Sequence, residues 1–141
     1  MLRQLLIQFF NMKNILLSKL GNEIADISID LSEQLEKVKK NSIANQIIRA
    51  GTSVGANISE SEEAESIQDF IHKISIANKE LSEFEYWIKL CCRKNLIKND
   101  PELLDKINHL QKIIAKLKFT SKIEMERRNK LKDLLKKNKK K

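Results

Sequence analysis

The stretch RAGTSVGANISE, residues 49–60, decides the fold of this chain. It contains two of the three glycines, Gly51 and Gly55, and small side chains surround both of them. A glycine inside a helix costs about 1 kcal/mol relative to alanine, so a helical glycine pair requires a compensating contact. Glycines at i and i+4 lie on one helix face and let another helix backbone approach closely. We therefore predict a close helix–helix contact; the alternative, a phosphate-binding loop, lacks the Gly-Lys-Ser/Thr that would complete it.

The composition favours a single all-α domain. The 141 residues include only three glycines, one proline and 5% aromatic residues, and a chain of this length can bury a substantial core. No apolar run approaches the roughly 20 residues that a membrane span needs, and the apolar N-terminus lacks a signal-peptide cleavage site. Cys91 and Cys92 are adjacent, so on a helix they point about 100° apart and are poor disulfide partners. We therefore expect a cytoplasmic protein with no membrane segment.

Apolar residues recur at spacings of three and four in four segments, the pattern of amphipathic helices. The segments cover residues 14–38, 43 to about 62, 70–91 and 101–123, and short polar connections separate them. Ser42 and Asp100 are the predicted N-caps of the second and fourth helices, and Pro101 follows as a first helical residue. We therefore predict an antiparallel up-down-up-down four-helix bundle. The predicted core seams are Leu16, Leu20, Ile24, Ile27, Leu31 and Leu35 or Val38 in the first helix, Phe70, Ile74, Ala77, Leu81, Phe84, Ile88 and Cys91 in the third, and Leu103, Ile107, Leu110, Ile114, Leu117 and Ser121 in the fourth.

The positive charge is confined to the C-terminal end. Residues 1–126 contain 18 basic and 18 acidic residues, whereas residues 127–141 contain nine basic residues and one acid, which accounts for the net charge of +8. We divide the chain into an N-terminal extension of uncertain structure (1–13), a bundle domain (14–126) and a basic tail that continues the fourth helix in part (127–141). Such a tail either binds nucleic-acid phosphates or serves as a solvated end that aids solubility, and the sequence leaves both open.

A second line of residues runs beside the core seam of the third helix. It contains Glu80, Glu83 and Trp87, so it is not a purely solvated face. We infer a partner for these carboxylates, either Arg49 of the same chain or a residue of a neighbouring subunit. Carboxylates in a structural ion pair are more common than carboxylates in acid–base catalysis.

No motif for catalysis or for a metal site is present. A di-iron bundle needs Glu-x-x-His on two helices, but Asp69-x-x-His72 is a single imperfect match and His109 has no acidic residue three positions away. Neither histidine follows an arginine by four to six residues, the spacing of some helical-bundle ribonucleases. Cys91 falls on the core seam, which favours a packed thiol over a nucleophile. We therefore expect no enzyme activity, no cofactor and no metal.

The sequence IIRAGTSVGANISESEEAESIQDFIHKISIANKELSEFEYWIKL, residues 47–90, resembles the bacterial four-helix proteins of the 23S ribosomal RNA intervening-sequence family. That family also contains the accessory variability determinant of diversity-generating retroelements. The resemblance extends over residues 14–123 and is most specific at 49–53, 55–58, 69–73 and 85–87. It implies an antiparallel bundle, a homopentameric ring, and an association with RNA or DNA or with a reverse transcriptase. It supplies no catalytic residues, and Arg49 falls on the family's arginine.

We therefore expect a non-enzymatic oligomer that associates with structured RNA or DNA through electrostatic contacts. The alternative is a protein–protein interaction scaffold or accessory subunit without direct nucleic-acid contact. The candidate nucleic-acid-binding residues are Arg49, Arg127, Arg128, Lys130, Lys132, Lys136 and Lys137. The candidate helix-packing or oligomer-contact residues are Gly51, Gly55, Asn57, Glu80, Glu83 and Trp87.

Overall fold

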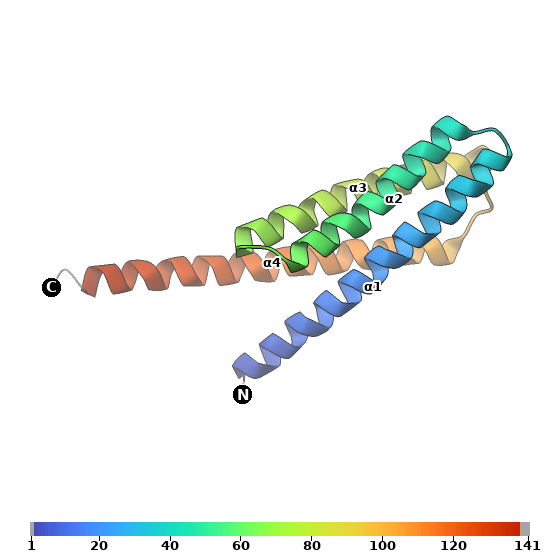
Figure 1. Cartoon of the computed structure of the whole chain (residues 1–141). Coiled ribbons are helices and arrows are strands. Elements are labelled where there is room, and N and C mark those ends of the chain that lie inside the picture. The colour runs from blue at the N-terminus through green and yellow to red at the C-terminus, as the bar shows by residue number, and fades with distance from the viewer. Residues whose placement is uncertain (1, 139–141) are drawn as a thin grey trace.

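The computed structural model describes the backbone of residues 2–138 and the side chains of residues 11–138. Within that range the chain forms four α-helices and no strand: α1 (Leu2–Lys37), α2 (Asn41–Glu62), α3 (Ile67–Arg93) and α4 (Pro101–Asn138). Each helix packs against the next one in sequence, and α1 also packs against α4 (Figure 1). The prediction of an all-α protein with four helices is therefore confirmed.

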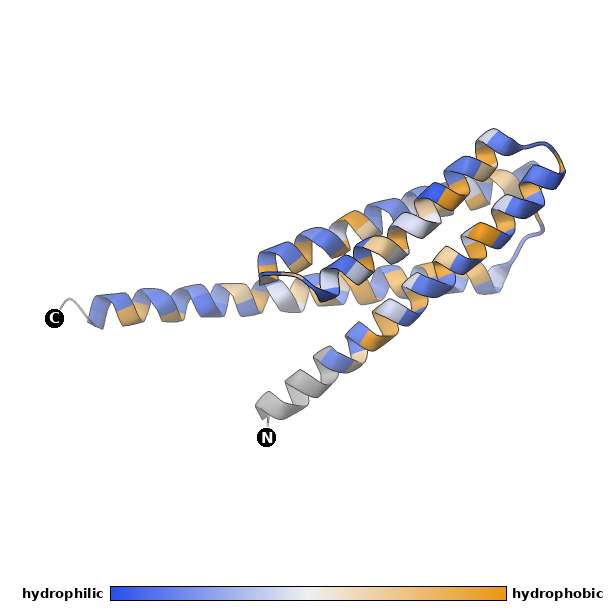
Figure 2. Ribbon diagram, viewed as in Figure 1, coloured by the Kyte–Doolittle hydropathy of each residue, from blue (hydrophilic) through white to orange (hydrophobic). Residues whose placement is uncertain are grey.

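The core seams of α3 and α4 follow the predicted spacing. All the predicted α4 positions are buried, and Ile113 joins them. The predicted α3 positions are also buried, except that Phe70 is only half-buried. Figure 2 shows hydrophobic residues along the sides of the helices that face one another and hydrophilic residues outside. Burial of these seams stabilises the fold by roughly 25 cal/mol for each Å² of apolar surface removed from water.

Helix α1 differs from the prediction in its core-facing residues. Leu20, Ile24 and Leu35 are buried as predicted, and Val38, the alternative to Leu35, is exposed. Leu16, Ile27 and Leu31 are only half-buried, whereas Leu17 and Ser28, which were not predicted, are 1% and 0% exposed. At Ser28 the physical reason is the close approach of α2, since a Cβ on Gly51 would lie 2.2 Å from Cβ of Ser28 and leaves no room for a larger side chain. The Ser28 hydroxyl donates a hydrogen bond of 2.6 Å to the carbonyl oxygen of Ala25, so the buried polar group is satisfied within its own helix.

The helix starts were predicted well at one connection and wrongly at another. The Asp100 carboxylate accepts a 3.1 Å hydrogen bond from the backbone N–H of Leu103, as an N-cap does. Ser42, by contrast, lies inside α2, because the chain turns at Lys39 (φ 60°) and the helix already begins at Asn41. The start of α3 is capped by Ser66, whose hydroxyl accepts a 3.0 Å hydrogen bond from the N–H of Asp69.

Helices α1 and α4 extend past the other two helices at one end of the bundle (Figure 1). The N-terminal part of α1 and the C-terminal part of α4 diverge from each other there (Figure 1). Residues 2–13, predicted as an extension of uncertain structure, are thus a helical continuation of α1, and α4 continues through the basic segment to Asn138. The side chains of residues 1–10 and the last three lysines of the predicted tail (139–141) lie outside the described residues. Over the part of the chain that the structure describes, none of the helices has a stretch long and apolar enough to cross a bilayer.

Candidate nucleic-acid interface

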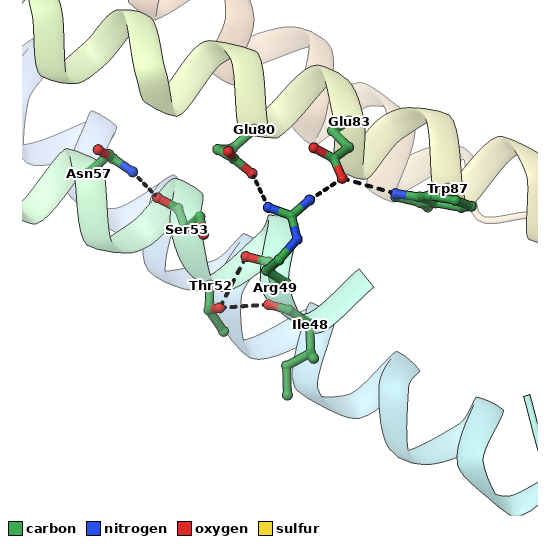
Figure 3. A network of polar contacts seen from close by, with 8 residues as sticks. All are labelled: Ile48, Arg49, Thr52, Ser53, Asn57, Glu80, Glu83 and Trp87. Atoms are coloured by element: carbon green, nitrogen blue, oxygen red, sulfur yellow. Dashed lines mark hydrogen bonds and ion pairs between the residues drawn. The ribbon is translucent and has the colours of Figure 1, made fainter. Parts of the chain in front are cut away.

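Arg49 links α2 to α3 through two carboxylates (Figure 3). Its Nη1 lies 3.2 Å from Oε2 of Glu80, and its Nη2 donates to Oε1 of Glu83. The indole Nε1 of Trp87 donates to the same Glu83 oxygen at 3.3 Å. The hydrogen bond from Arg49 holds the pKa of Glu83 below its usual range, and Glu83 in turn raises the pKa of Arg49. Of the two partners inferred for the glutamates, the structure shows the one in the same chain, so the charge of Arg49 is compensated internally.

The two glycines of α2 face α1 of the same chain. A Cβ built on Gly51 would lie 2.2 Å from Cβ of Ser28, and one built on Gly55 would lie 3.3 Å from Cβ of Ala25. Both glycines are buried, so neither is available to a partner protein. Asn57 is half-buried, and its Nδ2 donates a 2.8 Å hydrogen bond to the carbonyl oxygen of Ser53 within α2 (Figure 3). The small residues thus set the α1–α2 distance.

The basic segment of α4 begins with two arginines that share one carboxylate. Nε of Arg127 lies 2.9 Å from Oε2 of Glu124, and Nε of Arg128 lies 2.8 Å from Oε1. These hydrogen bonds lower the pKa of Glu124 to about 2. Part of the arginine charge is therefore neutralised by the helix itself, and the arginines are less available to phosphate than the sequence implied.

The next four cations form a lysine face, defined as Lys130, Lys132, Lys136 and Lys137. All four side chains are exposed, and none of them takes part in an ion pair within the described residues. At 100° per residue they lie on one side of the helix. The opposite side carries a leucine face, defined as Leu131, Leu134 and Leu135, whose side chains are 58%, 59% and 54% exposed. The end of α4 is therefore an amphipathic basic helix that packs against none of the side chains described at positions 11–138.

The remaining sequence candidates stay apart from this segment. His72 and His109 are exposed, and the described residues contain no group of three metal-ligating side chains. Cys91 is fully buried, and burial raises the pKa of its thiol. A buried thiol with a raised pKa is a poor nucleophile, which agrees with the interpretation of Cys91 as a packing residue.

Sequence reasoning missed a cavity of about 360 Å³, half open to solvent, at the end of the bundle where α1 and α4 diverge. This end cavity is lined by Leu17 of α1, Phe70 of α3 and Ser121 of α4, with Asn14 and Glu62 also at its wall. The signal that could have found it is the small polar residue at position 121 on an otherwise apolar core seam, where a larger side chain would have filled the space.

The fold and its surface define an all-helical protein of four packed helices with a cationic helical end. The chain belongs to the 23S rRNA-intervening sequence protein family, whose model matches residues 13–116. It is similar to the crystal structure of a protein with unknown function from the S23 ribosomal protein family of Bacteroides thetaiotaomicron, with 38% identity and a TM-score of 0.63. That match covers 77% of this chain and 96% of the other. No curated protein matches this chain. The basic end of α4 lies beyond the residues that the family model matches.

Proposed function

We propose that this protein binds structured RNA or DNA through the basic end of α4 and catalyses no reaction. The lysine face carries the proposal, because its four exposed ammonium groups lie on one side of a helix and have no carboxylate partner in the described chain. Cations so arranged replace the counterions condensed on a phosphate backbone. The segment has no aromatic side chain after Phe119, so base stacking does not contribute and binding is independent of nucleotide sequence.

Arg49 contributes to this function less directly than the lysines. Its guanidinium is already bonded to Glu80 and Glu83, so a phosphate would have to displace a carboxylate. We therefore assign Arg49 to the α2–α3 contact and assign phosphate binding to the lysine face.

We propose an antiparallel up-down-up-down arrangement and assembly into a homopentameric ring. The arrangement is supported by the short connections at 38–40, 63–66 and 94–100 and by the contact of each helix with the next. The ring rests on the family to which the chain belongs. Light scattering at micromolar concentration tests it, with a mass of five chains as the expected result and a monomer mass as the contradicting one. We also propose a cytoplasmic location, with RNA or DNA as the bound nucleic acid and a reverse transcriptase or another protein as a partner.

The second candidate function is a protein–protein scaffold without nucleic-acid contact. It is favoured by the leucine face, since three leucines that are more than half exposed on one helix side have no role in binding phosphate. Trp87 contributes little to it, because its indole is half-buried and bonded to Glu83.

Fluorescence anisotropy distinguishes the two functions. The full chain and the variant K130Q/K132Q/K136Q/K137Q are titrated against a labelled RNA hairpin and a DNA duplex at several salt concentrations. For each phosphate-contacting lysine that is removed, we expect the negative slope of log K against log salt to become shallower by about 0.7 to 0.9. The full set of substitutions therefore reduces the magnitude of the slope by about 3 and weakens binding at low salt.

The matched control removes four lysines from the other end of the bundle. The variant K39Q/K40Q/K94Q/K98Q loses the same charge from exposed positions beside the α1–α2 and α3–α4 connections. It keeps most of the affinity and the salt slope if the lysine face binds. Equal loss in both variants would show a diffuse charge effect, and no binding by the full chain at low salt would leave the scaffold function.

A further inference from the structure

The leucine face of α4 is exposed and is not covered by any of the residues whose side chains the structure describes. Leu131, Leu134 and Leu135 lie at i, i+3 and i+4, which places them on one side of the helix. Each is more than half exposed, and the lysine face lies on the other side. A nucleic acid bound by the lysine face would therefore leave the leucine face accessible to a protein surface.

The end cavity has the properties of a receptor for such a helix. Leu17 and Phe70 give it apolar walls, and its volume of about 360 Å³ far exceeds the roughly 30 Å³ of a water molecule. Oδ1 of Asn14, at the wall, is buried and accepts no hydrogen bond from the described residues. A buried acceptor without a donor is costly, so an occupant that suits this cavity supplies an N–H or ammonium donor as well as apolar side chains.

An acidic turn borders the end cavity. Glu62 at the end of α2, and Glu63 and Glu65 in the connection to α3, are exposed, and the segment 60–66 contains no basic residue. The end of α4 carries six basic residues and one acid between positions 127 and 138. The two surfaces are thus complementary in charge and in hydrophobicity.

The α4 end cannot enter the cavity of its own chain. Ser121 lines the cavity, and α4 continues from it as one helix to Asn138 without glycine or proline. At 1.5 Å per residue, Leu131 lies about 15 Å further along the axis. Pairing of two α4 ends with each other is opposed by the like charge on both. The partner that fits is the end cavity of a second copy.

We propose that the leucine face of one copy docks in the end cavity of a second copy, with the acidic turn of the second copy facing the basic edges of the docked helix. Oδ1 of Asn14 then accepts a hydrogen bond from a lysine or arginine at the edge of the leucine face. The lysine face points away from the contact and stays available to phosphate. This contact goes beyond the proposed nucleic-acid binding and does not depend on it.

Cross-linking between differently tagged chains tests the contact. One protein carries A64C, at the wall of the end cavity, and the other carries N138C, with C92S in both. Position 138 lies on the leucine side of α4, and position 129, nine residues earlier, lies 180° away at 100° per residue. N129C is therefore the matched control with the same substitution on the same helix. We expect the mixed disulfide to form at least tenfold faster with N138C than with N129C.

Charge and apolar variants complete the test. In the protein that carries A64C, E62K/E63K should slow formation of the mixed disulfide severalfold. In the other protein, L131S/L134S/L135S should make the disulfide form equally fast at positions 129 and 138, while RNA binding persists. Equal rates at positions 129 and 138, or faster formation of the N138C homodimer than of the mixed species, would overturn the proposal. So would flotation with anionic lipid vesicles that requires the leucines, because it would assign that face to a lipid surface. Loss of RNA binding in the lysine variants alone leaves this contact intact.

Discussion

Replacing Gly51 with alanine places a methyl group at the tightest point of the α1–α2 contact. That Cβ would lie 2.2 Å from Cβ and 2.6 Å from Oγ of Ser28, and 3.3 Å from the backbone oxygen of Ile24. Two carbon atoms that are not bonded to each other do not approach to 2.2 Å. Because Cβ of Ser28 is fixed to the backbone and cannot rotate away, α1 as a whole has to move.

The free energy of unfolding changes through two opposing effects. Overpacking a close contact costs about 1 to 3 kcal/mol, and this contact belongs at the upper end of that range. Alanine recovers about 1 kcal/mol of helix propensity relative to glycine. We therefore expect Gly51→Ala to lower the stability by about 2 kcal/mol, or the melting temperature by about 6 to 8 °C. Gly55→Ala is the control, since its Cβ meets Ala25 at 3.3 Å, and its stability should lie within about 1 kcal/mol of the parent.

Urea unfolding followed by circular dichroism, at one fixed protein concentration, measures the difference. Adding Ser28→Gly to Gly51→Ala removes the opposing Cβ, so the double mutant should be more stable than the sum of the single changes by about 1 kcal/mol or more. A Gly51→Ala variant as stable as the parent, or a double mutant without such coupling, would refute the close contact.

Three further predictions concern the polar contacts. Arg49→Lys keeps the charge but cannot bond to Glu80 and Glu83 together. We therefore expect the free energy of unfolding measured in urea to fall by about 0.5 kcal/mol. An unchanged free energy of unfolding would show that the Arg49 ion pairs do not stabilise the fold. Because the pKa of Glu83 is lowered and that of Glu124 is lowered to about 2, the unfolded chain binds more protons in acid. The contribution of these carboxylates to the free energy of unfolding is therefore fully present above their unfolded pKa of about 4.5 and is lost towards pH 2. A melting temperature that stays constant between pH 4.5 and pH 2 would contradict the lowered pKa values. Asp100→Ala removes the N-cap of α4 and should cost about 1 kcal/mol, whereas Asp100→Asn, which keeps an acceptor, should cost much less.

Local periodicity accounts for what could be predicted of the fold. The core residues of α3 and α4 follow from their three–four spacing, and the start of α4 follows from Asp100 and Pro101. The prediction for α1 was correct at Leu20, Ile24 and Leu35, but Leu17 and Ser28 are buried in place of Leu16 and Ile27. The spacing of apolar residues shows that a helix has an apolar side. Which of two adjacent rows of residues on that side faces the core depends on the distance to the neighbouring helix.

By itself, the sequence determined the helices, the family, the neutral bundle and the basic end, because each of these depends on residues close together in the chain. Only the tertiary structure decided that Arg49 pairs with glutamates of its own chain, since α2 and α3 must first be set side by side. It also revealed the end cavity, which forms from residues of different helices where α1 and α4 diverge. The exposure of the leucines at the end of α4 also follows from the tertiary structure, because α4 continues past the described side chains of the other helices.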